Sequence, residues 1–375
     1  MNGPLSGIRV IEVGHMLAGP YCGLLLADMG AEVIKIESPE GDIARSVSPH
    51  FIGPHNAYFA SLNRNKKSVV IDLASDAGRT QLEALVSRSH ALITNLRPSA
   101  IKKLGLTYSN LRRCNERIVC VALTGYGLEG QYAENPAYDY VIQALTGVMA
   151  LTGDPSAPPT KAGYSAVDNS AGLVAAMGLL AKIVEGKGGQ VDVAMYDVML
   201  SQLNYLAGAA LNTGEVVGRL ANSSHPYVVP AQIFPTADEW LTLFITHDKF
   251  WQKFCQEVGR PQWIDDPQFA TMADRRQNRE VVLAAIGEVL ISATAGEWVR
   301  RLVPLGVVAA EVGSLKQALE SDLTRSRNLV VSLGDGSQAL RAVASPLKFD
   351  GYTPHYGLPP LLNEHGNEVL GKVQT

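Results

Sequence analysis

The regular alternation of strand-like and helix-like segments in the first third of the chain constrains the fold most. Strand-like, β-branched runs at 9–13 and 32–36 flank an apolar helical pattern at 20–29. Further strand-like runs at 68–73, 91–95 and 118–123 are separated by a helical pattern at 76–89 and by short helical pieces up to residue 115. Such alternation predicts a parallel sheet with helices on both faces and right-handed crossovers. The expected fold class is α/β.

The remainder of the chain predicts a smaller second domain. Residues 139–210 show an apolar helical pattern with one short strand-like run at 190–194. Residues 212–230 are rich in Gly, Asn, Ser and Pro, a composition typical of a linker. Beyond the linker we expect two short strands within 232–244, followed by three amphipathic helices at 249–258, 274–290 and 295–303. A return to strand and helix at 307–349 and a Pro-rich tail at 351–375 complete the chain.

Composition argues against several classes of partner. The 375 residues are 46% hydrophobic and 18% charged, which is typical of a folded protein, and the net charge of −4 gives no overall field that attracts nucleic acid. The longest apolar stretch, 171–184, is interrupted by Gly178 and Lys182 and is too short for a bilayer of about 30 Å. The first seven residues lack the layout of a signal peptide. We therefore expect no nucleic-acid partner, no membrane partner and a cytoplasmic location.

Common cofactor, metal and hydrolase motifs are missing from the sequence. The first strand-to-helix turn, Gly14–Pro20, lies where α/β proteins often bind nucleotides, but it matches neither G-x-G-x-x-G nor the Walker loop. A plain turn and helix start is the alternative for this segment. The four cysteines form no C-x-x-C pair, the eight histidines have no metal-ligand spacing, and no G-x-S-x-G occurs. We expect no metal site and no serine hydrolase mechanism.

Two carboxylates are candidate functional groups. Asp168 stands immediately before an apolar helical run, where an N-cap is its ordinary structural role. The same place would let the positive end of the helix keep the carboxylate ionised for nucleophilic attack. Asp139 is the second candidate, and a cap or a hydrogen bond within the loop is its alternative role.

A third candidate segment, Asn95–Pro98, follows a predicted strand. It therefore lies at the carboxyl edge of the sheet, where open α/β sheets bind ligands. Lys102 and Lys103 come shortly after it and are either phosphate contacts or solvated helix charges.

Together these segments resemble the class III CoA-transferase family, which includes formyl-CoA:oxalate and carnitine CoA-transferases and, as a divergent branch, α-methylacyl-CoA racemase. The resemblance is collinear along nearly the whole chain. Its landmarks are Val10–Glu12, Ala18–Pro20, Gly30–Glu37, Gly41–Asp42 with Arg45, Asn65–Ser68, Asn95–Pro98, Thr124–Gly127, Asp168, Gly188–Gln190, and Pro360–Leu362 before Glu364–His365.

The resemblance implies a large Rossmann-like domain built from both ends of the chain and a smaller inserted α+β domain. We accordingly expect 1–211 to form the N-terminal part of the large CoA-binding domain, 212–230 the linker, 231–306 the small domain, and 307–375 the segment that returns to the large domain. The resemblance also implies an interlocked homodimer of ring-shaped subunits.

The resemblance further implies the site and the mechanism. Asp168 would be the covalent nucleophile that takes CoA from an acyl-CoA donor and passes it to a carboxylic acid acceptor, through an aspartyl anhydride and an aspartyl-CoA thioester. Coenzyme A and acyl-CoA are substrates in this family, and no cofactor is bound permanently. The implied CoA contacts are His15, Leu17, Ala18, Ile71, Asp72, Leu73, Ala74, Asn95, Leu96, Arg97, Lys103 and Tyr138.

Two departures from the family pattern keep alternatives open. The racemase branch carries a His-Asp pair where Tyr138-Asp139 stands here, so one of its two proton-transferring bases is missing. A racemase or epimerase of 2-methylacyl-CoA thioesters is therefore only the second hypothesis. Formyl-CoA transferases carry a glycine run over the active site, whereas residues 221–226 contain none, so oxalate specificity does not follow. A small dicarboxylate or hydroxy acid is the expected acceptor. A catalytically silent CoA-binding protein is the third hypothesis.

Overall fold

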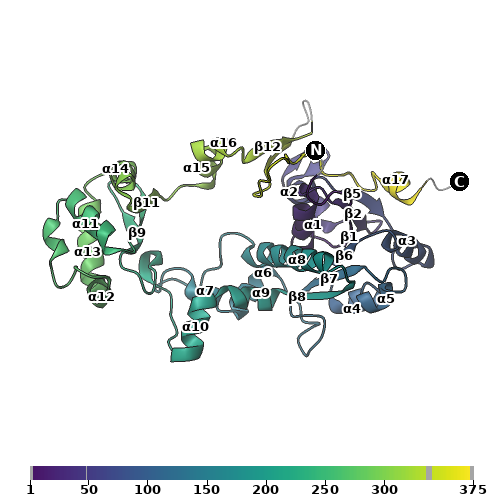
Figure 1. Cartoon of the computed structure of the whole chain (residues 1–375), viewed down its shortest axis with the longest axis horizontal. Helices are drawn as coiled ribbons and strands as arrows, with labels where there is room; N and C mark the ends of the chain where they lie inside the picture. Colours follow the sequence, from purple (N-terminus) through teal and green to yellow (C-terminus); the bar gives the residue numbers. More distant parts are fainter. Residues whose placement is uncertain (1–2, 48, 335–339, 372–375) are drawn as a thin grey trace. The chain divides into compact units, whose positions relative to one another are not determined.

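The structure is a computed structural model that describes residues 3–47, 49–334 and 340–371. Its chain divides into two compact units, which are described separately. Unit 1 comprises residues 1–146, 163–204 and 321–375, and unit 2 comprises residues 147–162 and 205–320. Figure 1 labels the elements of both units along the chain.

A six-stranded parallel sheet forms the centre of unit 1 (Figure 1). The strands pair in the order β5-β2-β1-β6-β7-β8, which is the 3-2-1-4-5-6 order of Rossmann folds. The α/β class and all six strand-like runs of the sequence are therefore confirmed, although β5 ends at Val70 rather than at residue 73. The strands are β1 (Arg9–Val13), β2 (Glu32–Glu37), β5 (Lys67–Val70), β6 (Ala91–Thr94), β7 (Val119–Thr124) and β8 (Gly189–Ala194).

Helices cover both faces of this sheet. On one face, α1 (Ala18–Asp28) packs against α8 (Ala166–Glu185), and on the other lie α3 (Asp76–Val86), α4 (Pro98–Lys103) and α5 (Tyr108–Leu111) (Figure 1). The two helices of the first face approach closely at Gly172, because a Cβ there would lie 2.8 Å from the carbonyl oxygen of Ala18. The start of α1 is therefore held beside the first turns of α8.

The face of the sheet beneath α1 buries four charged side chains that we call the buried charge network: Glu12, Lys35, Asp42 and Lys66. Lys35 Nζ lies 2.9 Å from Glu12 Oε1 and 2.8 Å from Asp42 Oδ2, and Lys66 Nζ lies 2.8 Å from Glu12 Oε2. None of the four side chains is more than 1% exposed. Charges this deeply buried are tolerated only when they are paired and hydrogen-bonded, so each depends on the others.

Shorter elements complete unit 1. The C-terminal segment packs on the sheet-forming part, since the Arg64 guanidinium donates to the carbonyl of Val343 and the backbone N–H of His365 donates to the carbonyl of Ser68. The elements are η1 (Ile43–Arg45), β3 (Phe51–Ile52), β4 (His55–Asn56), α2 (Ala57–Asn63), α6 (Asp139–Leu145), α9 (Met195–Gln202), α16 (Asp322–Ser326), β12 (Val330–Leu333), β13 (Leu340–Val343) and α17 (Gly366–Leu370).

Unit 2 contains a three-stranded antiparallel sheet in the order β11-β10-β9. Trp251, Trp263 and Phe269 stack in its core, and the fully buried guanidinium of Arg275 lies 4.7 Å over the ring of Trp251. The strands are β9 (Ala231–Pro235), β10 (Trp240–Phe244) and β11 (Val308–Glu311). The helices and turns are α7 (Val148–Leu151), α10 (Asn204–Thr213), η2 (Ala221–Ser223), α11 (Asp248–Glu257), η3 (Pro261–Ile264), α12 (Met272–Gln277), α13 (Arg279–Leu290), α14 (Ala295–Leu302), η4 (Val303–Leu305) and α15 (Leu315–Glu320).

Three details differ from the sequence-based expectations. The helix expected over 274–290 is broken at Asn278, whose side-chain amide donates to the carbonyl of Asp274 at 2.9 Å and competes with the helical pattern. Residues 308–311 pair with β10, so the sheet of unit 2 extends past the expected limit at 306. The linker and the domain limits as a whole stay a prediction.

The third detail concerns the apolar stretch 171–184, which lies within the 20-residue helix α8. By length and composition, α8 could cross a membrane, and the bent pair Arg279–Leu290 with Ala295–Leu305 passes the same test. In unit 1, α8 packs against α1, β7 and β8.

The buried charge network gives a stability prediction. Replacing Lys35 by Met leaves Asp42 without its cation inside the protein, so we expect a loss of about 3–5 kcal/mol in the free energy of unfolding. The matched control is Lys67→Met, because Lys67 also pairs with two carboxylates but its side chain is 29% exposed. The control should cost below about 1 kcal/mol. Urea denaturation of both variants checks this, and equal losses would contradict it.

Candidate active site

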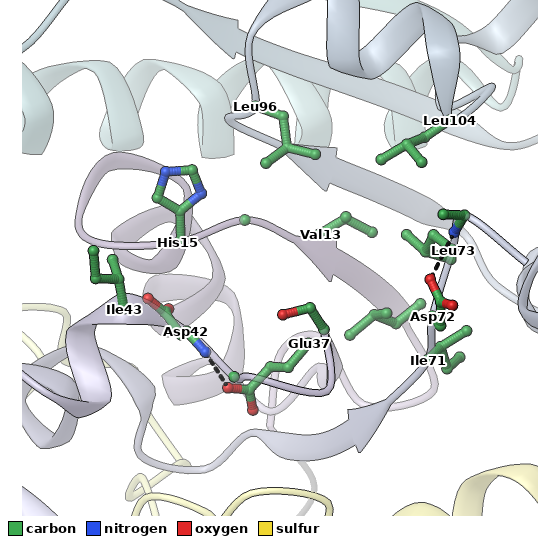
Figure 2. A pocket seen from close by; sticks show the side chains of 15 residues that line it. Val13, His15, Glu37, Asp42, Ile43, Ile71, Asp72, Leu73, Leu96 and Leu104 are labelled. Atoms are coloured by element: carbon green, nitrogen blue, oxygen red, sulfur yellow. Dashed lines mark hydrogen bonds between the residues drawn. The ribbon is translucent and has the colours of Figure 1, made fainter.

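A pocket of about 450 Å³ opens in unit 1 at the carboxyl edge of the parallel sheet (Figure 2). It lies where β1, β2, β5 and β6 end, beside the point at which the strand order reverses between β1 and β6. Ligands of open α/β sheets bind at such switch points. The lining residues are Val13, Gly14, His15, Ile36, Glu37, Ser38, Gly41, Asp42, Ile43, Ile71, Asp72, Leu73, Ala74, Leu96 and Leu104.

The pocket combines apolar walls with a polar rim. Figure 2 shows Leu96 and Leu104 on one side and Glu37 and Asp42 on the other. The carboxylate of Glu37 is paired with Arg45 at 2.6 Å, and that of Asp42 with Lys35. Although burial opposes it, these cations hold the pKa of both carboxyl groups below the usual range. An apolar slot with a hydrogen-bonding rim suits the base and ribose of a nucleotide.

The sequence-predicted CoA contacts fall into two groups. The structure brings His15, Leu96 and residues 71–74 together as lining of the pocket. The other predicted contacts do not line the pocket. Leu17 and Ala18 lie at the start of α1, and the side chain of Asn95 bonds the backbone of His15. Arg97 and Lys103 are exposed at the two ends of α4, and Tyr138 is 71% exposed before α6. Contact of any of these residues with CoA stays a prediction.

The sequence analysis missed part of this pocket. Glu37, Ser38 and the segment 41–43 line it after β2, and Leu104 lines it after α4. The signal for the first group was available, because the carboxyl ends of neighbouring parallel strands meet at one sheet edge. Leu104 carried no signal, since an apolar residue after a short helix is ordinary core.

Asp168 lies in the first turn of α8, but it is not the N-cap. Ser165 holds that position, and Asp168 is the third residue of the helix. The free N–H groups of Val167 and Asp168 instead donate to Asp139 Oδ2, at 2.7 and 3.3 Å. The N-cap role expected for Asp168 is therefore wrong, because a carboxylate from α6 occupies the helix end.

Both oxygens of Asp139 are used in this arrangement. Its Oδ1 accepts a hydrogen bond from the side-chain amide of Gln143 at 2.6 Å. Asp139 thus has the cap role that the sequence analysis gave as its alternative, at a helix 28 residues further along the chain.

The environment of Asp168 changes its acidity. Burial, and then the negative charge of Asp139, raise the pKa of Asp168 to about 7. The sequence analysis expected the opposite, a carboxylate kept ionised by the helix; the difference arises first from burial and then from Asp139, which already accepts the terminal N–H groups. Within the described part of the chain, neither a hydrogen bond nor a cation counters this rise in the pKa of Asp168.

Tyr58 of α2 is a neighbour of Asp168 that no sequence pattern indicated. Burial, and then the charge of Asp168, raise the pKa of Tyr58 to about 12. Its hydroxyl therefore stays protonated at neutral pH and remains a potential hydrogen-bond donor near Asp168. The backbone N–H of Tyr58 donates to Asn56, which caps the short helix and fixes its first turn.

No group of three His, Cys, Asp or Glu side chains within residues 3–47, 49–334 and 340–371 could hold a metal ion. The candidate features are the pocket at the sheet edge and the carboxyl group of Asp168, with its raised pKa, at the start of α8.

Comparison with known proteins shows which enzymes and structures the chain resembles. The chain is 32% identical to the acetyl-CoA:oxalate CoA-transferase of Acetobacter aceti over 97% of this chain and 94% of that protein. It is also 32% identical to the succinate–glutarate CoA-transferase of Agrobacterium fabrum, with 99% and 96% covered. Among solved structures, a CaiB/BaiF family protein from Brucella suis is similar with a TM-score of 0.85, at 30% identity and with 98% and 99% of the chains covered. A mutant of Rv3272 from Mycobacterium tuberculosis has a TM-score of 0.89, at 30% identity and with 99% and 100% covered.

The family itself follows from a match that spans nearly the whole chain. The profile described as CoA-transferase family III matches residues 5–366. The resemblance inferred from the sequence landmarks is confirmed, and the chain belongs to CoA-transferase family III as an enzyme of the class III CoA-transferases.

Proposed function

We propose that this enzyme moves CoA from an acyl-CoA donor to a carboxylic acid acceptor through covalent intermediates on Asp168. The raised pKa of Asp168 carries the proposal. The buried carboxylates Glu12, Glu37 and Asp42 are each paired with a cation and have lowered pKa values. A carboxyl group left unpaired and basic is a candidate for chemistry rather than for structure.

The proposed reaction consists of four acyl transfers. The ionised Asp168 oxygen attacks the donor thioester, which forms a mixed anhydride and releases the CoA thiolate. The thiolate attacks the aspartyl carbonyl, so that an aspartyl-CoA thioester forms and the donor acid leaves. The acceptor carboxylate attacks this thioester, which gives a second anhydride and the thiolate. The thiolate then attacks the acceptor carbonyl, so that the new acyl-CoA leaves and the Asp168 carboxylate is restored.

The elements around Asp168 support these steps. Each attack places negative charge on a carbonyl oxygen, which needs hydrogen-bond donors. The hydroxyl of Tyr58 is a suitable donor, because it stays protonated and lies close enough to Asp168 for the charge of that carboxylate to raise its pKa. The pocket would hold the nucleotide end of CoA, with His15, Leu96 and residues 71–74 as contacts.

The acceptor proposed is a small dicarboxylate or hydroxy acid. The support is three relatives, an acetyl-CoA:oxalate, a succinyl-CoA:glutarate and a succinyl-CoA:mesaconate CoA-transferase. A screen of such acids against acetyl-CoA and succinyl-CoA, analysed by mass spectrometry, would identify it.

Racemisation of 2-methylacyl-CoA remains the alternative function. Such a reaction needs two groups that exchange a proton with the α-carbon. Asp139 is engaged in capping α8 and in a bond to Gln143, and Tyr138 is exposed, so this pair offers no ready base. Exchange of the α-proton with solvent deuterium in the absence of acceptor acid would favour the alternative.

A homodimer is proposed for the same enzyme, interlocked as in the family. The supporting observation is an apolar face of α8 on which Leu173, Met177 and Val184 are 50%, 65% and 88% exposed. Apolar patches of this kind mark contact surfaces. The cytoplasmic location stays a prediction.

The covalent mechanism predicts an adduct on Asp168. Incubation with acyl-CoA should add the mass of CoA less one water to the wild-type chain, and Asp168→Ala should show no adduct and lose activity by about a thousandfold or more. The matched control is Asp197→Asn, because Asp197 is likewise the third residue of its helix, α9, but is exposed. The control should keep both the adduct and the activity. An active Asp168→Ala enzyme would refute the mechanism.

The raised pKa of Asp168 predicts a conflict between activity and stability. The folded protein keeps the proton on Asp168 up to about pH 7, whereas the unfolded chain loses it near the ordinary value of 3.8. Stability from this group is therefore lost as the pH rises from about 4 to 7.

Asp168→Asn removes this titration. The difference in unfolding free energy between this variant and the wild type should shift in favour of the variant by about 2–3 kcal/mol between pH 5 and pH 8. Over the same range the wild-type kcat should rise, because only the carboxylate is nucleophilic. Urea denaturation and initial rates at each pH provide the check, and a pH-independent difference in stability would contradict the assignment.

A further inference from the structure

The first strand-to-helix turn is held by a side chain from another strand end. Asn95, which follows β6, accepts the backbone N–H of His15 through Oδ1 at 3.0 Å and donates through Nδ2 to the carbonyl of His15 at 2.9 Å. Both the oxygen and the nitrogen of the amide therefore bond the same residue of the turn.

Two glycines make room for this side chain. A Cβ at Gly14 would lie 2.5 Å from Asn95 Oδ1, and a Cβ at Gly19 would lie 3.0 Å from the same amide group. Asn95 thus occupies the space between the two ends of the turn, and the spacing of the glycines in Gly14–Pro20 follows from that contact.

The buried charge network holds the turn from the opposite side. Lys35 Nζ donates to the carbonyl of Gly14 at 2.9 Å, and Asp42 Oδ1 accepts the backbone N–H of Met16 at 3.1 Å. Met16 has φ of 62°, a left-handed conformation that a residue with a side chain rarely adopts. The conformation of the turn therefore depends on hydrogen bonds with Lys35, Asp42 and Asn95, because Met16 would not favour this φ by itself.

The shape of the turn decides one wall of the pocket. His15 lines the pocket from the turn, and Leu96, the residue next to Asn95, lines it from the end of β6 (Figure 2). The two bonds of Asn95 set the position of His15 relative to Leu96 across the pocket mouth.

We infer that Asn95 is a positioning residue, which acts on CoA by holding His15 against the pocket and not as a direct ligand of CoA. This inference rests on the proposed role of the pocket as the site for the nucleotide end of CoA. Because that end lies away from the reacting thioester, Asn95 should contribute binding that is equal in the ground state and the transition state. Such binding alters KM and leaves kcat unchanged.

The test compares the whole substrate with its two halves. With Asn95→Ala, the KM for acyl-CoA and the Kd for adenosine 3′,5′-bisphosphate should each rise by about tenfold, as expected for the loss of two hydrogen bonds that fix the site. The kcat with acyl-CoA and the kcat/KM with the matching acyl-pantetheine, which has no nucleotide, should stay within about twofold of the wild type.

The matched control is Asn115→Ala. The side-chain amide of Asn115 also bonds backbone groups: it donates to the carbonyls of Val86 and Ser89 and accepts the N–H of Arg117. Asn115 lies outside the pocket. It should change the midpoint of thermal unfolding as Asn95→Ala does and leave both KM and Kd unchanged. If Asn95→Ala does not fold, Asn95→Asp keeps the acceptor for His15 and should raise the same two constants.

Two outcomes would overturn the inference. Wild-type KM and Kd in a folded Asn95 variant would show that the turn does not need the residue. Equal losses with acyl-CoA and acyl-pantetheine would show that Asn95 supports the reacting centre or the fold in general. Neither outcome bears on the adduct at Asp168, so failure here is distinguishable from failure of the proposed function.

Discussion

The ion pair between Glu12 and Lys35 is the interaction on which the rest of unit 1 depends. These residues are direct partners in the register of β1 and β2, and both are fully buried beneath α1. A shift of one residue in either strand would send one charge to the opposite face of the sheet and leave the other unpaired inside the protein. The pair therefore fixes the register of the two strands whose ends form the pocket. Through Asp42 and Lys66 it also reaches the loops that follow β2 and precede β5, and it sets the carboxyl edge of the sheet as a whole.

Asp168 differs from the carboxylates of the buried charge network in having a raised pKa, which no cation among the described residues counters. Glu12 and Asp42 are paired with cations, and their pKa values are lowered, so both are ionised at neutral pH and already have partners. Asp168 lies at the start of a helix whose terminal N–H groups are taken by Asp139, and its pKa is raised. The same fold thus pairs the carboxylates at the sheet edge with cations and leaves the Asp168 carboxylate, with its raised pKa, where a thioester would be opened. A group that destabilises the folded protein when ionised is more easily explained by chemistry than by structure.

The sequence predicted local features well and long-range ones poorly. The six strands were evident because a sheet buried on both faces requires continuous β-branched runs, and these stand out in a single sequence. The break at Asn278 was missed because an amide that binds the carbonyl of Asp274 does not alter the apolar period. The cap of α8 was missed for a different reason: its donor and acceptor lie 28 residues apart, and either Asp139 or Asp168 could fill the role by pattern alone. Asp168 itself was identified from resemblance to a family, since as a residue it had an adequate structural explanation.

The separation of the pocket from Asp168 suits a substrate with a long, flexible arm. Neither Asp168 nor any other residue of α8 lines the pocket at the sheet edge, so the groups that would hold the nucleotide and the group that would open the thioester belong to different elements. Binding at the nucleotide end can then be strong and uniform without depending on which acid is attached. Under the proposed function, discrimination between acids would arise near Asp168. Under the proposed function, the nucleotide site could stay the same among relatives whose names give acids as different as oxalate and glutarate, because the two tasks belong to separate elements.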